Sequence, residues 1–361
     1  MRIAYFIYWL DGASTGVFKK VINQVSFWVQ AGNEVTLWLA GKPEDEAEYT
    51  QRVSEIGARI EYFPTRGSIG RWLRWVGLKR RLQGRCFDAY YHRFDLATPG
   101  LVAAMRPELW IVEINSNDRV EYALTPGFRD YYNRVTRDRL FSRAGAGIFM
   151  TKELASAREF AAFRGPREVI ANGADFRSIP HFPAPVSDVP VQFLFMGSDG
   201  QSWHGVDKLP ALAKARPDWT IHAVGVSEKM FPAGRPENIR LHGRLKRDEY
   251  EPLARHCTAG FGTLALHRKH MNEACALKVR EYLAFGLPVI LGYADVDIPQ
   301  GARYALQLPN REENVSMSVE RINGFVDSWR GRRVHRSEIA HMDTAVKERK
   351  RIEFIERIAR G

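Results

Sequence analysis

Hydrophobic residues follow two alternating patterns along the chain, from the first residues to about residue 300. Short apolar runs are followed by longer segments in which apolar residues recur every three or four positions. Buried strands joined by amphipathic helices produce this alternation, which is typical of a parallel sheet wrapped by crossover helices. The predicted strands cover residues 3–8, 35–39, 59–63, 88–91, 109–114, 147–150, 169–171, 191–196, 220–224, 239–241, 259–263, 288–291 and 305–308. The sequence therefore predicts an α/β fold.

The predicted strands form two series, which indicates two doubly wound units. Residues 172–190 lie between them, are rich in proline and lack apolar periodicity, so we expect an exposed linker that serves as a hinge. We expect an N-terminal domain over residues 1–175 and a C-terminal domain over residues 176–336. The charged helical segment 337–361 is expected to pack back on the first domain. Because open α/β sheets bind ligands at the carboxyl ends of their strands, the chemistry is sought there.

Composition narrows the class of protein. A chain of 361 residues, 45% of them hydrophobic, can bury a full core. Its three cysteines have no C-x-x-C spacing, which argues against a disulfide framework or a cysteine zinc site. No apolar run is long enough to cross a membrane and no secretion signal is evident, so we expect a cytoplasmic protein. The net charge of +11 favours an anionic partner without choosing among nucleotide, nucleic acid and membrane.

The turn after the first predicted strand is one candidate for phosphate binding. Residues 11–16 have the sequence Asp-Gly-Ala-Ser-Thr-Gly and lead into an amphipathic helix, so their amides and the helix N-terminus could meet an anion. Gly16 is the residue of this turn that we expect at the ligand. The turn is neither G-x-G-x-x-G nor a P-loop, and an ordinary βα turn remains an alternative.

The segment 272–290 carries the most informative motif. Glu273 and Glu281 are separated by seven residues, with Lys278 between them, and the helix pattern begins after Cys275. Carboxylates accept paired hydrogen bonds from vicinal hydroxyls, and a lysine near a helix N-terminus neutralises phosphate. Both carboxylates can reach one ligand only if Glu273 precedes the helix, because eight helical steps span about 12 Å. A solvated helix face is the structural alternative.

Glu273-x7-Glu281, followed by Ala-Phe-Gly-Leu-Pro-Val-Ile, resembles the E-x7-E donor motif of glycosyltransferase family 4, whose members are retaining GT-B enzymes that use nucleotide sugars. Other segments agree in order along nearly the whole chain. Residues 12–19 resemble the family's glycine loop and following helix, residues 31–37 its "GHEV" segment, and residues 170–175 its "PNGVD" segment. The stretch from Gly197 to Val206 is similar to its "GR…KGV" region.

This resemblance implies a GT-B fold with two Rossmann-like domains facing across a cleft. It implies transfer of a hexose-type sugar from a nucleotide diphosphate sugar to a hydroxyl of a glycan or lipid-linked acceptor, with retention, in polysaccharide or glycolipid synthesis. Glu273 would hold sugar hydroxyls, Lys278 the diphosphate and Glu281 the ribose. The other expected donor-site residues are Gly16, Ser198, His204, Gly243, Arg244, Leu245 and Leu277, and the expected acceptor residues are Arg93, Glu113 and Asn115. No metal or cofactor is expected, because protein cations replace it.

The departures from the family pattern leave two rival functions open. Ser198 and His204 stand where the family usually has the arginine and lysine that hold the diphosphate, and Asn115 lies where a histidine is usual. A weak or inactive sugar-nucleotide-binding protein is therefore one alternative. A nucleotide-sugar epimerase on the same paired architecture is the other, since fold does not determine function. The Asp295-Val296-Asp297 triplet is interpreted as a loop coincidence, because two isolated carboxylates do not specify a metal.

A basic segment suggests a further partner. From Arg66 to Arg85 the chain has seven basic residues and no acidic one, interleaved with apolar residues at helical spacing. This predicts a basic amphipathic helix, with Trp72 and Leu73 facing inward and Trp75 outward, that could bind an anionic membrane surface. An ordinary crossover helix with solvated arginines is the alternative. Nucleic acid is not an expected partner, because no basic and aromatic module of known spacing is present.

Overall fold

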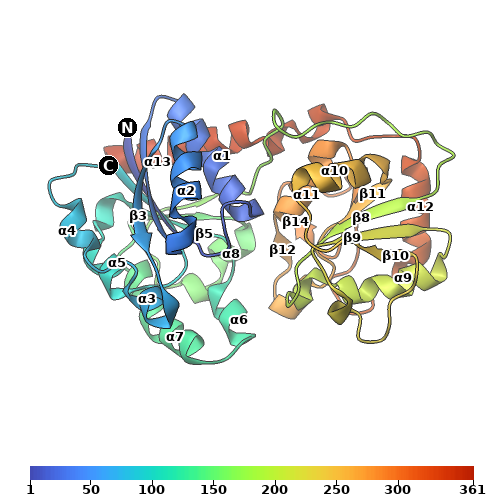
Figure 1. Cartoon of the computed structure of the whole chain (residues 1–361), viewed down its shortest axis with the longest axis horizontal. Coiled ribbons are helices and arrows are strands. Elements are labelled where there is room, and N and C mark those ends of the chain that lie inside the picture. Colours follow the sequence, from blue (N-terminus) through green and yellow to red (C-terminus); the bar gives the residue numbers. More distant parts are fainter. The chain divides into compact units, whose positions relative to one another are not determined.

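The chain folds into two compact α/β units, which are described separately below (Figure 1). The computed structural model describes residues 1–361, except for the side chains of Ser68, Ile69 and Arg71. Unit 1 contains residues 1–171 and 344–361, and unit 2 contains residues 172–343. The chain thus passes between the units twice, a few residues from the predicted boundaries in each case.

Unit 1 is a parallel sheet with strand order β3-β2-β1-β4-β5-β6-β7, covered by helices. Every strand predicted for this half is present. The elements are β1 (Arg2–Tyr8), α1 (Gly16–Gln30), β2 (Glu34–Gly41), α2 (Glu46–Glu55), β3 (Arg59–Pro64), α3 (Gly67–Leu73), α4 (Leu78–Leu82), β4 (Ala89–Arg93), α5 (Pro99–Ala104), β5 (Trp110–Ile114), α6 (Asp118–Ala123), α7 (Phe128–Phe141), β6 (Ala146–Phe149), α8 (Lys152–Ser156), β7 (Arg167–Val169) and α13 (Thr344–Arg360).

The central strand β1 is buried on both faces, which explains its unbroken run of apolar residues. Neighbouring side chains on a strand point to opposite faces, and the aromatic core divides accordingly. Tyr5 contacts the rings of Trp28 and Tyr91 on one face. Phe6 stacks with Trp110 on the other, at a ring separation of 4.9 Å. The aromatic content of this half of the sequence therefore builds two layers that sandwich the sheet.

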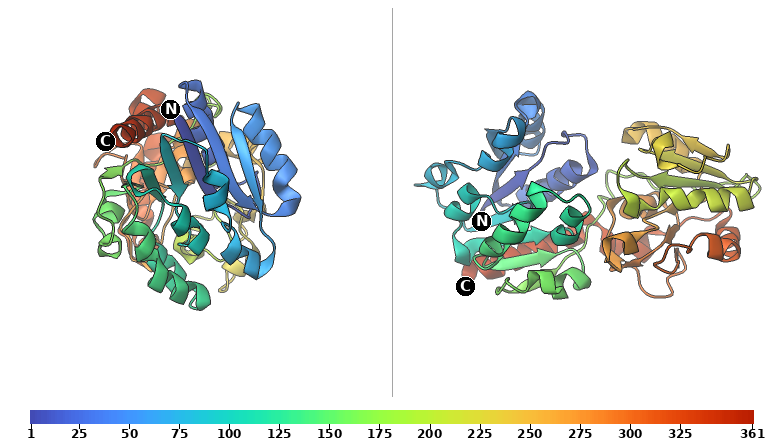
Figure 2. Two further views of the ribbon diagram at one scale, coloured as in Figure 1. Left: turned by 90° about the vertical axis from the view of Figure 1, so that its left-hand side faces the viewer. Right: turned by 90° about the horizontal axis from the view of Figure 1, so that it is seen from below.

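The C-terminal helix α13 packs on α1 and β4 within unit 1 and lies beside the N-terminal strands, although it is most distant from them in sequence (Figure 2). The Trp28 indole donates a hydrogen bond of 2.9 Å to Glu348, and Arg351 is fully buried. A returning C-terminal helix was expected from residue 337, but residues 337–343 belong to unit 2.

Unit 2 is a second parallel sheet, with strand order β10-β9-β8-β11-β13-β15. The predicted strands are again present, and the sequence pattern missed only the two-residue pair β12 and β14. The elements are β8 (Gln192–Met196), α9 (Leu209–Ala215), β9 (Thr220–Val224), β10 (Ile239–Leu241), α10 (Arg247–His256), β11 (Ala259–Phe261), β12 (Glu273–Ala274), α11 (Leu277–Phe285), β13 (Val289–Leu291), β14 (Ala294–Asp295), β15 (Ala305–Gln307) and α12 (Val319–Trp329). Short 3-10 turns at Ser202–His204 and Val206–Lys208 precede α9.

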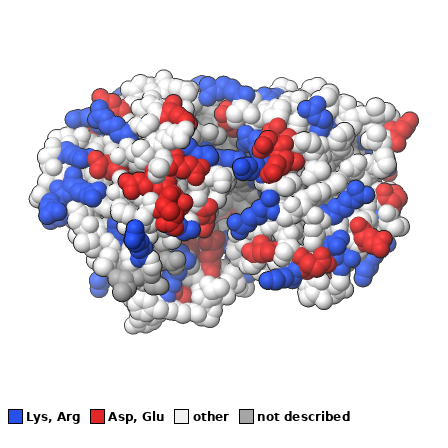
Figure 3. Space-filling model, in the orientation of Figure 1, with Lys and Arg blue, Asp and Glu red and all other residues white. Residues whose placement is uncertain are grey.

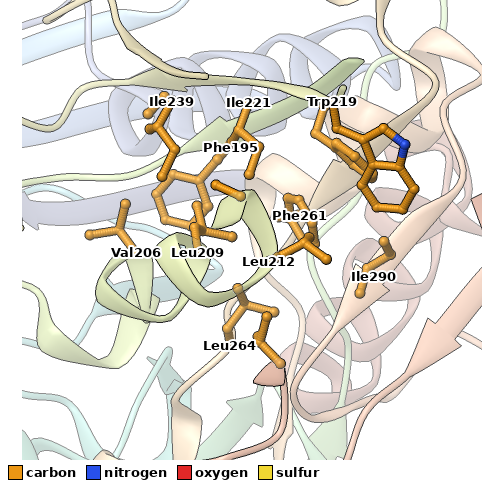
Figure 4. Packing of buried hydrophobic residues seen from close by; sticks show 14 of the residues in the cluster. Phe195, Val206, Leu209, Leu212, Trp219, Ile221, Ile239, Phe261, Leu264 and Ile290 are labelled. Carbon is orange, nitrogen blue, oxygen red and sulfur yellow. The ribbon is translucent and has the colours of Figure 1, made fainter. Parts of the chain in front are cut away.

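A hydrophobic cluster packs the helices α9 and α12 against one face of the sheet in unit 2 (Figure 4). Leu209 and Leu212 of α9 enter it from the helix, while Phe195, Ile221 and Phe261 enter from three strands. Side chains three positions apart on a helix share a face, so the apolar spacing of α9 matches this packing. The cluster thus fixes α9 against this face of the sheet.

Residues 172–190 are only in part the exposed linker that their proline content predicts, because residues 183–190 are mostly exposed whereas the residues before them are anchored. Phe176, Ile179 and Phe182 are buried, and Phe182 stacks on Phe285 at a ring separation of 4.9 Å. The Phe182 amide donates to the Phe285 carbonyl, so this segment is part of unit 2. Proline removes regular backbone structure but does not prevent single apolar side chains from anchoring a segment.

The basic segment 66–85 does not form one amphipathic helix, and this prediction is wrong. Gly77, at φ +82°, separates the short helices α3 and α4. The indole of Trp75 was expected outside but is buried, 5.1 Å from the ring of Phe63, whereas Leu73 was expected inside and is exposed. Arg74 is also buried and pairs with Asp95. The side chains of Ile69 and Arg71, on which the prediction also drew, lie outside the described residues.

The surface charge is mixed on the face shown in Figure 3, where Lys and Arg alternate with Asp and Glu. Within the described part of the chain, the structure has no helix with the length and apolar character needed to span a bilayer.

Candidate functional site

The loops that follow strands β8, β9 and β10 meet at the carboxyl edge of the sheet in unit 2. Gly225, at φ +80°, donates its amide to the carbonyl of Gly243 over 2.6 Å. A Cβ atom on Gly225 would lie 2.3 Å from the carbonyl oxygen of Gly197, so the two backbones approach too closely for a side chain. Glycine at these positions therefore lets three loops form one wall.

His204 and Ser198, which stand at the predicted phosphate positions, contact each other on this wall. The Ser198 amide donates to Nδ1 of His204 over 3.2 Å, so in the neutral ring the proton lies on Nε2. Burial, followed by the charges of Lys278 and Lys269, holds the pKa of His204 well below its usual value. His204 is therefore a neutral hydrogen-bond donor at physiological pH, and it offers Nε2–H rather than a positive charge.

Lys278 lies in the first turn of α11 and supplies the charge that His204 lacks. Its Nζ donates to the Met196 carbonyl over 2.8 Å and lies 4.6 Å from the ring centre of Phe195. Burial lowers its pKa to about 7. No ion pair joins Lys278 to a carboxylate of the described residues, which leaves an ammonium with two further N–H groups to neutralise an anion.

Glu281 lies one turn further along α11 and is oriented by two residues of α10. Its Oε1 accepts hydrogen bonds from Arg247 Nε at 2.9 Å and from the Tyr250 hydroxyl at 2.8 Å. The side chain is 16% exposed, and Oε2 accepts no hydrogen bond from a described residue. One oxygen thus positions the carboxylate, and the other can accept from ligand hydroxyls. Sequence analysis missed Arg247 and Tyr250, whose i,i+3 spacing on a predicted helix was the available signal.

Glu273 and Leu277 occupy the positions that the E-x7-E interpretation requires. Glu273 lies in the short strand β12, paired with Ala294, and α11 begins at Leu277. Because Glu273 precedes the helix, its distance from Glu281 is not set by the rise of about 12 Å that eight helical steps would give.

Residues 243–245 follow β10. Gly243 adopts φ +61° and Arg244 is exposed, whereas Leu245 is partly buried. The carbonyl of Gly243 is tied to Gly225, which connects this turn to the wall described above.

Asp295 and Asp297 are held by a cation of the protein. Arg280 is buried and donates to both oxygens of Asp295, at 2.7 and 2.9 Å, and to Asp297 at 3.1 Å. Within the part of the chain that the structure describes, there is no cluster of three or more His, Cys, Asp or Glu side chains that could hold a metal. The aspartate pair therefore has a structural partner.

In unit 1, the loop between β1 and α1 has the geometry of a helix N-terminus. Thr15 caps α1 by accepting from the Phe18 amide, and the Trp9 indole donates to Thr15 at 2.9 Å and to the Gly12 carbonyl at 3.2 Å. Gly16, the first residue of α1, is exposed. Its amide is thus one of the groups at the helix terminus that an anion can approach.

The three predicted acceptor residues meet at the ends of β4 and β5 in a charged cluster. Arg93 donates to Asn115 at 2.6 Å and to Glu113 at 3.1 Å. Lys20, which sequence analysis missed, donates to Glu113 at 2.7 Å and to Asn115 at 3.2 Å. Burial raises the pKa of Glu113, but Lys20, Arg351 and Arg93 outweigh it and hold that pKa well below the usual value.

This cluster changes the expected role of Glu113. Its side chain is fully buried, so the carboxylate positions Lys20 and Arg93 and is not itself exposed to an acceptor. The side chains of Lys20 and Arg93 are 9% and 16% exposed to solvent. The Nδ2 group of Asn115 is buried and makes no hydrogen bond to a described residue. Arg351 reaches the cluster from α13, a contact that no local sequence pattern signals.

Comparison with known proteins identifies the fold of the chain. No family model matches the sequence, and no curated protein matches it. Among solved structures, HepE of Anabaena in complex with UDP and glucose is 16% identical, with a TM-score of 0.65 over 99% of both chains. WaaG, a glycosyltransferase involved in lipopolysaccharide biosynthesis, is 14% identical, with a TM-score of 0.66 over 98% of this chain and 99% of its own.

A putative UDP-N-acetylglucosamine 2-epimerase from Listeria monocytogenes is similar as well, at 13% identity and a TM-score of 0.54 over 98% of this chain and 94% of its own. At these identities the similarity concerns the fold. The two parallel-sheet units, their strand orders and these neighbours together show that the chain has the GT-B fold, built from two Rossmann-like domains.

Proposed function

We propose that this protein is a glycosyltransferase that moves a sugar from a nucleotide diphosphate sugar to a hydroxyl group of a glycan or lipid-linked acceptor. The observation that carries the proposal is the set of side chains at the carboxyl edge of unit 2. Lys278 supplies a positive charge, His204 a neutral donor and Glu281 an oriented carboxylate. These groups match a diphosphate next to a ribose. The solved complex of HepE with UDP and glucose has the same fold.

In the proposed reaction, the acceptor oxygen forms a bond to the anomeric carbon while the bond from that carbon to the diphosphate oxygen breaks. The acceptor hydroxyl releases its proton to solvent or to the departing nucleotide diphosphate, which takes the electron pair of the broken bond and carries the developing negative charge. Lys278 and Nε2–H of His204 stabilise this charge, and donors fixed in advance in a protected site contribute a few kcal/mol each. Glu281 binds the ribose hydroxyls and Glu273 the sugar hydroxyls. Gly243, Arg244 and Leu245 frame the base.

The finer assignment is part of the same proposal. Membership of glycosyltransferase family 4, retention of configuration and a hexose donor rest on the resemblance of the segment from Glu273 to Glu281. The acceptor would meet unit 1 through Arg93, Asn115 and Lys20, which Glu113 positions. A role in cell-surface polysaccharide or lipopolysaccharide synthesis is supported by WaaG, a glycosyltransferase of lipopolysaccharide biosynthesis whose fold this chain shares.

The first test is thermal unfolding of the purified protein against a panel of nucleotides and nucleotide sugars. A ligand present at about 100 times its dissociation constant stabilises the folded state by ~2.7 kcal/mol. We expect one base to give a selective shift that Glu281→Ala abolishes and Tyr250→Phe reduces. Glu320→Ala, which removes an exposed carboxylate of α12, is the matched control and should keep the full shift. The absence of any shift with every nucleotide would refute the donor site.

Turnover separates the glycosyltransferase from its two rivals. We expect the donor found in the panel to be consumed, with release of nucleoside diphosphate, only when a glycan or lipid-linked acceptor is present. Conversion of the donor to an isomer without acceptor would favour the epimerase, the class of the structural neighbour from Listeria monocytogenes. Donor binding without turnover over a broad acceptor panel would favour a binding protein. This alternative arises because Ser198 and His204 replace the two cations that are usual in the family.

We also propose that unit 1 docks on an anionic membrane, through a surface that joins the end of α3 to α6 and α7 rather than through one long basic helix. Among the described residues, six of the nine exposed large hydrophobic side chains lie on α3, α6, α7 and the turns beside them. They are Leu73, Val76, Leu124, Phe128, Tyr131 and Val135. Trp72 ties α3 to α7, because its ring lies 5.2 Å from Phe128 and 4.6 Å from Tyr132. Exposed arginines of α7 border this surface, which suits anionic headgroups.

Vesicle co-sedimentation tests this surface directly. Phe128 and Tyr131 are 66% and 64% exposed, so Phe128→Ser with Tyr131→Ser should leave folding intact. We expect this double variant to lose binding to vesicles that contain phosphatidylglycerol. Val186→Ser, at a residue that is 71% exposed in unit 2, is the matched control. Equal binding by the double variant and the control would refute the docking surface.

A further inference from the structure

A second cavity lies in unit 2, at the opposite edge of the sheet from the proposed donor site. Its volume is about 1030 Å³, and its walls come from residues 181–184, from Arg303 and from residues 328–338. Arg303 precedes β15, and Arg333 donates to the carbonyls of Arg255 and Cys257, which precede β11. The strands are parallel, so the cavity adjoins their amino ends, whereas Lys278 and His204 lie at the carboxyl ends. The cavity is therefore separate from the donor site.

The floor of the cavity is held in a fixed shape. The buried Arg333 guanidinium also donates to the Pro183 carbonyl, at 3.3 Å, and burial lowers its pKa to about 10. His181 contacts the Val334 carbonyl through Nε2 at 2.8 Å. Both side chains bridge residues 181–184 to the segment after α12. The cavity is thus bounded by segments that are tied together, and its volume is typical of a small-molecule site.

The walls offer two guanidinium groups and an aromatic surface. Arg303 and Arg332 are exposed, and neither side chain makes a hydrogen bond or an ion pair with another described residue. The indole of Trp329 donates to the Arg303 carbonyl over 3.1 Å, which orients its ring in the wall. Phe182 also lines the cavity, but its ring is buried against Phe285. Among the lining residues, Glu338 is the acidic one, and it accepts from the His335 amide.

We propose that this cavity is a second binding site, for an organic anion with a planar apolar body and a phosphate or carboxylate group. Guanidinium groups recognise both anions through paired hydrogen bonds, and they do so best where a nearby wall excludes water. The exposed part of the Trp329 ring accommodates the planar body. Arg303 and Arg332 hold the anion at the cavity mouth. The proposal does not depend on the donor site, since none of these residues takes part in it.

The test uses 1-naphthyl phosphate as the probe, with binding to the full chain measured by calorimetry. 1-Naphthoate distinguishes a carboxylate from a phosphate as the anion. 1-Naphthol lacks the anion, and inorganic phosphate lacks the apolar body. We expect saturable binding of one or both naphthyl anions at least about 10-fold tighter than binding of 1-naphthol or of inorganic phosphate. UDP-glucose should not displace the probe.

Variants locate the bound probe. Arg303→Met with Arg332→Met should weaken probe binding by at least about 10-fold, because both exposed guanidinium groups are removed while folding is unaffected. The response to nucleotide sugars should not change in this double variant. Arg321→Met, at an exposed arginine of α12 outside the cavity, is the matched control. The proposal would be overturned if UDP-glucose displaced the probe or if the double variant bound it as tightly as the unmodified protein. It would also be overturned if 1-naphthol or inorganic phosphate bound equally well, or if binding did not saturate up to about 1 mM.

Discussion

The burial of Lys278 makes the proposed binding of a nucleotide sugar dependent on pH, by an amount that can be calculated. With a pKa of about 7, this lysine is about 90% protonated at pH 6 and about 10% protonated at pH 8. A bound diphosphate favours the ammonium form and raises the pKa. The ligand must therefore draw a proton onto Lys278 when it binds above pH 7, and the complex weakens as the pH rises through that value.

The expected magnitude follows from these fractions. Binding should take up about 0.9 proton at pH 8 and about 0.1 at pH 6. The dissociation constant should rise about 10-fold between these two pH values, which corresponds to ~1.4 kcal/mol. A nucleotide sugar is the right ligand for this measurement, because its diphosphate is esterified at both ends and does not itself titrate in this range.

Isothermal titration calorimetry in two buffers of different ionisation enthalpy measures the proton uptake. Lys278→Met should bind more weakly and show neither the uptake nor the pH dependence, because it keeps the side-chain volume without the titrating group. Lys214→Met, at an exposed lysine of α9, is the matched control and should behave like the unmodified protein. An uptake below about 0.3 proton at pH 8, or one that persists in Lys278→Met, would refute this reasoning.

Two further predictions concern stability. Arg351→Met removes a buried cation from Glu113, so we expect the free energy of unfolding in urea to fall by about 3 kcal/mol; an unchanged unfolding midpoint would contradict the role of α13. The lowered pKa of Glu113 stabilises the fold above about pH 4.5 and the contribution is lost on acidification, so the variant should show a smaller loss. Gly205→Ala should destabilise the fold more than Gly200→Ala. Both glycines have a positive φ, of +71° and +77°, so alanine is strained at either position. Only at Gly205 would the new Cβ also lie 2.9 Å from the Cβ of Leu264. Equal losses in urea denaturation of the two glycine variants would show that this close approach is relieved at no cost.

Much of the fold follows from local sequence, because a parallel strand that is buried on both faces must be apolar along its whole length. The run from Ile3 to Ile7 shows this in unit 1, and β8 shows it in unit 2. The E-x7-E spacing likewise requires Glu273 to precede the helix, and the structure places α11 from Leu277 onward. Hydrophobic periodicity and helix boundaries are properties of neighbouring residues, and a single sequence records them.

The environment of each side chain depended on residues far away in the chain. The pattern of segment 66–85 predicted one helix with Trp75 outside, but the segment divides into α3 and α4, separated by a turn that contains Gly77, and the indole is buried. Glu113 was predicted to contact the acceptor, but the fold brings Lys20 of α1 and Arg351 of α13 to its buried carboxylate. Periodicity shows that a face is apolar but not what covers it.

The sequence alone therefore determined the α/β class and the positions of the strands, and it predicted which residues form the proposed nucleotide-sugar site. The tertiary structure decided how those residues are held. It placed the Ser198 amide on Nδ1 of His204, oriented Glu281 through Tyr250, and buried the ammonium of Lys278. The protonation and orientation of a group depend on burial and on nearby charges, which only the folded chain brings together.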